Sequence, residues 1–305
     1  MNKDQQVISN NKNKDIELRA TNRRVSEIHH FRKAFFGRKL VAFGLVIILL
    51  LIMTAIFAPL IAPYNPYKTD VDHQLAQPGR EHLLGTDAVG RDTLSRIIYG
   101  SRISLMVGIV VVLIAASVGI TLGLIAGYSG GITNSIIMRL MDSMMAIPMI
   151  LLALVIAALL GGGMKNIMIA LGIGLIPGYA RLMCGQVLSV KESDYITAAR
   201  SFGAGNIRIM IVHILKNCFP PLIVMMTLML GMAILAEAGL SFLGIGIEAP
   251  EAAWGSMVSD GYRYLLGNPI LSIAPGLAIM VVVFSFNLVG DGLRDALDPR
   301  LRGRL

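Results

Sequence analysis

Three ionisable residues, Asp142, Arg181 and Glu237, interrupt or border stretches of the sequence that are otherwise apolar. Asp142 and Arg181 lie near the ends of such stretches, whereas Glu237 lies deeper, within residues 235–240. A charge in an apolar medium is costly unless it faces protein or water, and such residues often mark the route of a polar substrate. We therefore expect Glu237 and Asp142 to line a possible translocation path. Two simpler interpretations stay open: helix neighbours can satisfy a buried Glu237, and Arg181 can reach a membrane surface with its long side chain.

The motifs of the common enzyme classes are absent from the sequence. Residues 161–165 read GGGMK and are too short for a phosphate-binding loop, and there is no His-Glu-x-x-His or Gly-x-Ser-x-Gly motif. The histidines are scattered, and Cys184 and Cys218 show no metal-ligand spacing and cannot form a disulfide framework. We therefore expect no enzymatic activity, no catalytic residues, no cofactor and no metal site.

The composition indicates the kind of element that must hold these residues. The chain has 305 residues and a net charge of +8, yet only 15% of its residues are charged and 55% are hydrophobic. Soluble proteins carry about 25% charged residues. The low charged fraction and the mean hydropathy of +0.68 therefore indicate a membrane protein.

Six apolar stretches are long enough to be membrane-spanning helices. The first, residues 40–62, has 23 residues without a charge and would be about 35 Å long as a helix, at roughly 1.5 Å per residue. A cleaved signal peptide would have a shorter apolar core of about 7–15 residues. The other stretches are residues 103–127, 140–160, 167–187, 219–245 and 270–290. We therefore expect an all-α, polytopic membrane protein with six transmembrane helices.

The polar segments define the expected domain organisation. Residues 1–39 form an N-terminal tail, residues 40–102 contain the first transmembrane helix and an external loop, residues 103–290 form a five-helix core, and residues 291–305 form a C-terminal tail. Lys and Arg concentrate in cytoplasmic segments of membrane proteins, and 20 of the 27 basic residues share the side of the two tails. We therefore expect both termini in the cytoplasm.

One cytoplasmic segment, residues 193–216, is well patterned yet too polar to cross a membrane. The first apolar face at helical spacing comprises Tyr195, Ala198, Ala199 and Phe202. The second comprises Ile207, Met210, Ile211 and Ile214. Ser193 can cap the first helix, Gly203 can take the positive φ that ends it, and Asn206 can cap the second helix. The segment therefore predicts two short helices at the inner membrane surface, joined at Gly203.

Three roles are open for this segment. Ala198 and Ala199 allow close backbone approach, which favours docking into a groove on another protein. An amphipathic loop that rests on lipid headgroups is the simpler alternative. A DNA-binding helix-turn-helix has a similar shape, but a loop tethered between two membrane spans cannot reach a duplex, so we expect no nucleic-acid partner.

Several motifs resemble those of one transporter family. Residues 197–203, TAARSFG, with His213, Ile214 and Leu215 after them, resemble the EAA loop of binding-protein-dependent ABC importer permeases. Three further motifs resemble the C-type permease subunit of the dipeptide/oligopeptide/nickel subfamily: GTDAVGRDTLSR at 85–96, AEAGLSFLG at 236–244 and NLVGDGLRDALDPR at 287–300. The resemblance extends from about residue 30 to the C-terminus.

The resemblance implies a permease subunit that imports di- or oligopeptides across the bacterial inner membrane. The implied partners are a second, similar permease subunit, two ATP-binding cassette ATPase subunits and an extracytoplasmic substrate-binding protein. The outer loops, residues 63–102 and 246–269, would meet the binding protein. Residues 193–216 would dock on the ATPase subunits, and the motif assigns this coupling to Tyr195, Thr197, Ala198, Ala199, Arg200, Ser201, Phe202, Gly203, His213, Ile214 and Leu215.

Two residues depart from the family pattern. Thr197 stands where the motif begins with Glu, and Lys216 stands where Pro usually follows His-Ile-Leu. The second helix is therefore free to continue until Pro220 and Pro221 stop it. We expect docking to survive because the two alanines and Gly203 are present.

Two other functions remain open. Within the family, the alternative cargoes are nickel chelates, glutathione and opines. In a different class, the alternative is an ATP-independent secondary transporter, which would need no docking loop.

Overall fold

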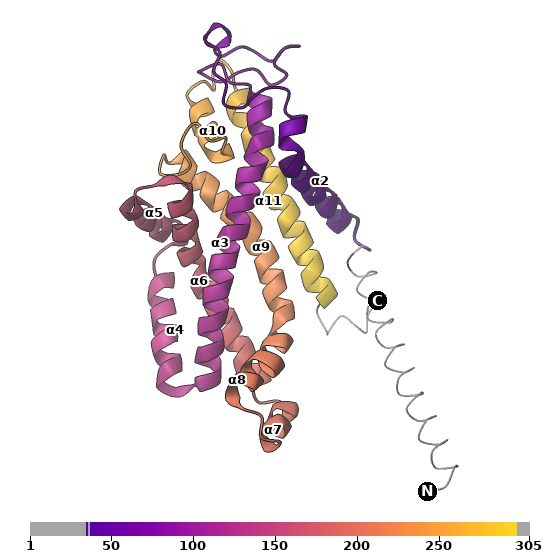
Figure 1. Ribbon diagram of the computed structural model, residues 1–305, viewed down its shortest axis with the longest axis vertical. Coiled ribbons are helices and arrows are strands. Elements are labelled where there is room, and N and C mark those ends of the chain that lie inside the picture. The colour runs from indigo at the N-terminus through magenta and orange to yellow at the C-terminus, as the bar shows by residue number, and fades with distance from the viewer. Residues whose placement is uncertain (1–34, 36, 298–305) are drawn as a thin grey trace, which may run out of the picture.

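The computed structural model describes residue 35 and residues 37–297, and within that part of the chain helices form the whole regular structure (Figure 1). The longer helices are α2 (Lys39–Ile61), α3 (Thr93–Ser129), α4 (Gly131–Met145), α5 (Met149–Leu160), α6 (Gly163–Val190), α9 (Lys216–Phe242) and α11 (Ile270–Leu297). The short helices are η1 (Val71–His73), α7 (Asp194–Ser201), α8 (Asn206–Arg208), the π-helical turn η2 (Ile209–Leu215) and α10 (Trp254–Tyr262). The expected all-α fold is confirmed.

Among the described residues, five helices are long and apolar enough to cross a membrane, and the pair α4 and α5 makes a sixth if it counts as one span. These two helices meet at an angle of 90°, so the predicted span at residues 140–160 is not one straight helix. The break lies at Ala146, Ile147 and Pro148, and Pro148 immediately precedes α5. Proline lacks a backbone N–H and disfavours a helical residue before it, which explains the break.

Helices α3 and α6 form the closest helix pair of the bundle. Gly119, Gly123 and Gly127 follow one another at intervals of one turn on the α3 face that meets α6. A β-carbon at Gly119 would lie 2.6 Å from Tyr179 Cβ, and one at Gly127 would lie 2.7 Å from Val187 Cβ. Small residues at such an interface let two backbones approach closely, which is how membrane helices gain packing energy.

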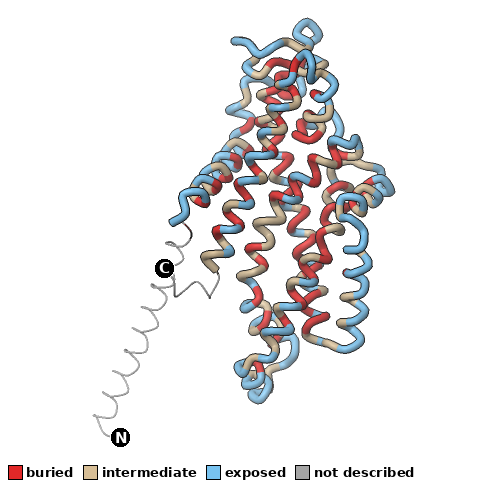
Figure 2. The backbone as a smooth tube through the Cα atoms, turned by 180° about the vertical axis from the view of Figure 1, so that it is seen from behind, coloured by how far each residue is buried: buried red, intermediate tan, exposed pale blue. Residues whose placement is uncertain are grey.

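Helix α2 packs on the opposite side of the bundle, against α3 and α11. Its buried residues Val41, Gly44, Ile48 and Leu51 face inward, whereas its outer side exposes large apolar side chains (Figure 2). An exposed face of this composition matches hydrocarbon rather than water. The helix thus closes one flank of the bundle toward lipid.

The outer loops are shorter than the sequence suggested. The segment expected as a loop to residue 102 becomes helical at Thr93, because Asp92 accepts a hydrogen bond from Ser95 N at 2.8 Å and caps α3. The segment expected as a loop at residues 246–269 contains α10. Both loops meet above the bundle (Figure 1).

The two predicted tails lie largely outside the described residues. Of the segment 1–39, the structure describes residue 35 and residues 37–39, and Phe35 is buried. Of the segment 291–305, residues 291–297 continue α11.

Candidate functional site

The segment 193–216, which we call the coupling loop, protrudes from one end of the bundle (Figure 1). Helix α7 begins after Ser193 and ends where Gly203 takes φ +80°. The Gly203 and Ala204 N–H groups donate to the carbonyls of Arg200 and Ala199, at 2.9 and 3.1 Å. The predicted glycine turn is therefore confirmed, and its geometry is that of a helix C-terminus with a left-handed residue.

A buried side of the coupling loop fastens it to the bundle. Ile196 of α7 and Ile209 and Ile214 of η2 are completely buried in one cluster with Met183 and Val187 of α6. The helical pattern of residues 193–216 did not predict this role for Ile196. It is the one large aliphatic side chain in α7, and that composition was the available signal.

Hydrogen bonds add to this fastening. The Tyr128 hydroxyl donates to Asn206 Oδ1 at 2.7 Å, and the Arg200 guanidinium lies 5.8 Å from the centre of the Tyr128 ring. Asn206 was expected to cap the second helix, but Gly205 precedes that helix and the Asn206 side chain is used for Tyr128 instead. Ser193 precedes α7 as expected, although its side chain makes no capping hydrogen bond.

The other side of the coupling loop presents apolar and small side chains to the outside. Phe202 is 91% exposed and Ile207 is 74% exposed, with Tyr195 and Ile211 also exposed. Of the remaining residues assigned to coupling, the exposed ones are Thr197, Ala198, Arg200, Ser201 and Gly203, the half-buried ones are Ala199, His213 and Leu215, and Ile214 is buried. Partial burial of the ring raises the pKa of Tyr195, so its hydroxyl is neutral near pH 7.

The second half of the coupling loop differs from the prediction. Ile207, Met210, Ile211 and Ile214 do not share one face: Ile207 and Ile211 are exposed, whereas Ile214 is buried. The π-helical turn η2 changes the spacing of residues around the axis, so the ordinary α-helical period fails here.

The predicted helix stop is also wrong. Pro220 and Pro221 lie inside α9, and residues 206–242 form one continuous helix. A proline removes one N–H bond but does not always end a helix in a membrane protein, because local π-type adjustment can satisfy the freed groups. The turn η2 precedes these prolines directly.

The two candidate path residues have different environments. Glu237 is completely buried, Ser241 Oγ donates to its Oε1 at 2.6 Å, and its Oε2 has no hydrogen-bond partner among the residues that the structure describes. Asp142 pairs with Arg181, not with the neighbouring Arg139, and the two side chains are 58% and 54% exposed. The structure therefore does not bring Glu237 and Asp142 together on one open surface.

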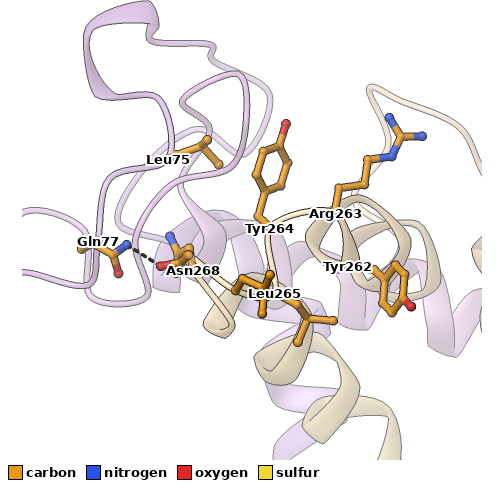
Figure 3. Close-up of a pocket in the computed structure, with 9 residues that line it drawn as sticks. Leu75, Gln77, Tyr262, Arg263, Tyr264, Leu265 and Asn268 are labelled. Atoms are coloured by element: carbon orange, nitrogen blue, oxygen red, sulfur yellow. Dashed lines mark hydrogen bonds between the residues drawn. The ribbon is translucent and has the colours of Figure 1, made fainter.

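The opposite end of the bundle carries a groove that sequence reasoning missed (Figure 3). It has a volume of about 600 Å³ and lies between Leu75 and Gln77 of the first outer loop and residues 262–268 after α10. Gln77 Nε2 donates to Gly267 O at 3.0 Å and holds the two loops together. Tyr262 and Leu266 are exposed beside it. Because its two walls are almost 200 residues apart in the chain, no local pattern indicated it.

Among the described residues, no group of three or more His, Cys, Asp or Glu side chains is placed to hold a metal ion.

Two protein-family models match the chain. Residues 119–303 match the binding-protein-dependent transport system inner membrane component, and residues 26–78 match the N-terminal transmembrane domain of oligopeptide transport permease C. The chain belongs to this family of ABC importer permeases. The permease is accordingly a multi-pass protein of the inner membrane, and its family works with ATPase and substrate-binding partners.

Three curated relatives illustrate how much of the permease is shared. It is 49% identical over 280 residues to the dipeptide transport system permease protein DppC of Escherichia coli K12, covering 90% of this chain and 92% of that protein. It is 46% identical to the dipeptide permease DppC of Alkalihalophilus pseudofirmus, with 87% of each chain covered. It is 44% identical to the di/tripeptide permease DppC of Pseudomonas aeruginosa, with 91% and 93% covered.

A solved structure shows the same fold. The inward-facing MetNI methionine ABC transporter matches with a TM-score of 0.56 at 20% identity, over 67% of the permease and 97% of that chain. The family and the fold thus agree with the resemblance drawn from the sequence.

Proposed function

We propose that this permease is the C-type subunit that carries di- or oligopeptides across the bacterial inner membrane, driven by ATP hydrolysis on partner subunits. It would pair with a second, similar permease above two ATPase subunits, receive its cargo from an extracytoplasmic binding protein, and leave the cargo chemically unaltered. The observation that carries the proposal is the exposed apolar side of a firmly anchored coupling loop.

The anchoring supports mechanical coupling in particular. A force applied to Phe202 or Ile207 passes through Ile196 and Ile214 to α6 and α9, because these side chains are packed in one cluster without free space for independent motion. Rocking of these helices would alternate access between the two membrane sides. An apolar loop resting on lipid headgroups would not need this attachment.

The placement of the helix ends supports a cytoplasmic location of both termini. The beginning of α2 and the end of α11 lie toward the coupling-loop end of the bundle, and Arg38 forms an ion pair with Asp295 (Figure 1). The outer groove and its exposed Tyr262 and Leu266 would then face the binding protein.

Peptide cargo is favoured over nickel chelates, glutathione and opines by the names of the relatives, which are dipeptide or di/tripeptide permeases. A secondary transporter would have no use for an anchored docking loop. We therefore keep the peptide importer as the proposed function and expect no catalytic activity of the permease itself.

The test changes the glycine joint of the coupling loop. Gly203→Val places a β-branched residue at φ +80°, although no atom lies within 4 Å of the added Cβ. Backbone strain of this kind costs on the order of 1–3 kcal/mol and would displace α7 from its docked geometry. We expect ATP-dependent uptake of a labelled dipeptide into vesicles holding the complete transporter to fall roughly tenfold or more.

Gly205→Val is the matched control, because Gly205 is exposed in the same loop, has free space around it and a φ of −67°. Uptake with this variant should stay near the original rate. Equal uptake by correctly inserted Gly203→Val would contradict the coupling role, and uptake that needs no ATPase subunit would contradict the importer itself.

A further inference from the structure

The chain between α9 and α10, residues 243–253, turns back into the outer end of the bundle; we call it the return segment. Ile247 and Ala253 are buried in the central core cluster with Val107 and Val111 of α3. A loop at the outer surface of a membrane protein is ordinarily exposed to water. Residues 243, 244 and 248–251 of the return segment are exposed in this way, whereas residues 246, 247, 252 and 253 are buried between the helices at the outer end.

The side chain of Ser241, near the end of α9, holds the return segment by a hydrogen bond. Ser241 Oγ accepts a hydrogen bond from Ile247 N at 3.0 Å and donates one to Glu237 Oε1 at 2.6 Å. Gly246 lies so close to Ser241 that any β-carbon there would collide with it. The orientation of the Ser241 hydroxyl is therefore fixed by Glu237, and the position of the return segment by Ser241.

Two further side chains hold the return segment against α3. Arg96 of α3 donates to the carbonyls of Pro250 and Glu251 at 3.3 and 3.2 Å. Trp254, directly after the segment, donates from Nε1 to Ile97 O at 2.9 Å. The return segment is thus clamped onto α3 and α9, the two helices that an outward opening would have to separate from it.

Only one of the two oxygens of the Glu237 carboxyl forms a hydrogen bond in this arrangement. Its Oε2 is buried, and no side chain or backbone group within residues 37–297 forms a hydrogen bond with it. A buried polar group without a partner destabilises the state that contains it, so this oxygen lowers the cost of leaving the closed arrangement. Such a hydrogen-bond network is suited to a segment that must both stay attached to the bundle and detach from it.

We propose that the return segment is the outer gate of the permease and that Glu237 is the positioning residue that keeps the gate closed by orienting Ser241. The inference rests on the proposed function, since only an alternating-access transporter needs an outer gate. Opening would break the bond between Ile247 N and Ser241, withdraw Ala253 from the core and admit cargo from the binding protein.

The experiment measures access to the gate without using cargo. Ala253→Cys is placed in the complete transporter in right-side-out vesicles, and its labelling by a membrane-impermeant maleimide is timed. Cys184 and Cys218 are both buried, and the parent without the added cysteine gives the background. Ser241→Ala and Glu237→Ala should each accelerate labelling roughly tenfold, as expected when a buried hydrogen-bonded contact is lost.

Two variants separate gating from loss of stability. Glu237→Gln keeps an oxygen that accepts from Ser241, so its labelling should stay near that of the parent. Ser104→Ala removes another buried hydroxyl, one without a hydrogen-bond partner, and should not change the labelling. Unchanged labelling in Ser241→Ala, or equal acceleration in Ser104→Ala, overturns the proposal.

Peptide uptake is measured in the same vesicles. If the labelling pattern is as expected, the gate proposal is supported even when no peptide enters the vesicles. The absence of peptide uptake would then contradict only the proposed cargo. If peptide uptake is normal and Ala253→Cys is labelled equally in all variants, only the gate proposal is contradicted.

Discussion

At the residue scale, the outer loop holds a titratable pair whose charges stabilise each other. His73 Nδ1 and Asp70 Oδ2 are 3.0 Å apart, and Asp70 also accepts from Asp72 N at 3.2 Å at the start of η1. The hydrogen bond with Asp70 raises the pKa of His73 above 6.5, and the same bond lowers the pKa of Asp70 below 3.8. The raised histidine contributes stability below pH 6.5 that is lost as the pH rises through its pKa in the folded protein. The lowered aspartate contributes stability above pH 3.8 that is lost as the pH falls.

The pair therefore stabilises the outer loop most between about pH 3.8 and 6.5. We predict that an NMR titration of the His73 imidazole gives a midpoint above 6.5, and that Asp70→Asn lowers it toward this value. Asp72→Asn, next to the pair, should change the midpoint much less because Asp72 acts on His73 by its charge alone, whereas Asp70 also forms the hydrogen bond. A midpoint that Asp70→Asn leaves unchanged would show that the pair does not form.

At the scale of elements, the α3–α6 pair determines where the coupling loop can move. The glycines of α3 bring α6 close, and α6 carries Met183 and Val187 into the cluster that anchors Ile196. In the proposed mechanism, force from α7 would pass to a helix pair whose close spacing depends on glycine.

Gly123→Leu is expected to force this pair apart, since even a β-carbon at Gly123 would collide with the backbone carbonyl of Ala180. Overpacking of this kind costs typically 1–3 kcal/mol, and we expect about 3 kcal/mol because the obstacle is backbone. The measurement is the thermal unfolding midpoint of purified permease. Gly185→Leu on the exposed side of α6, with no atom near its Cβ, is the control and should shift the midpoint little. Similar shifts for both variants would contradict a close α3–α6 contact.

At the scale of the whole molecule, Arg96 joins parts of the outer end that are distant in sequence. Its guanidinium donates to Pro66 O at 3.1 Å and to two carbonyls of the return segment, and Arg96 is buried. One side chain on α3 thus ties the first outer loop to the proposed gate. If one loop moved, for example on contact with a binding protein, Arg96 would displace the other loop as well.

Arg96→Gln should release both loops together. The donor of these hydrogen bonds is a buried charged group, and hydrogen bonds of that kind are worth about 1.5–3 kcal/mol each, so amide hydrogen exchange should accelerate at least tenfold in residues 63–92 and in the return segment. Arg102→Gln, on the same helix but exposed, should leave the exchange of both segments unchanged. Acceleration in only one of the two segments would contradict the joint clamp.

Features that depend on local composition and local backbone geometry could be predicted from the amino-acid sequence. Uninterrupted apolar runs predicted the membrane helices, since crossing lipid requires length and low charge within one segment. Polarity identified residues 193–216 as a loop, and Gly203 predicted its turn because the left-handed conformation favours glycine. The motif order also predicted the family, which the comparisons confirmed.

The contacts between residues distant in the chain became visible in the folded protein. It paired Asp142 with Arg181, buried Glu237 beneath the return segment, and divided Ile207 from Ile214 by a π-helical turn. It also bent the third predicted span into α4 and α5 and formed the outer groove from two distant loops. These outcomes depend on close approach between segments far apart in the chain, and hydropathy and helical periodicity carry no information about that approach.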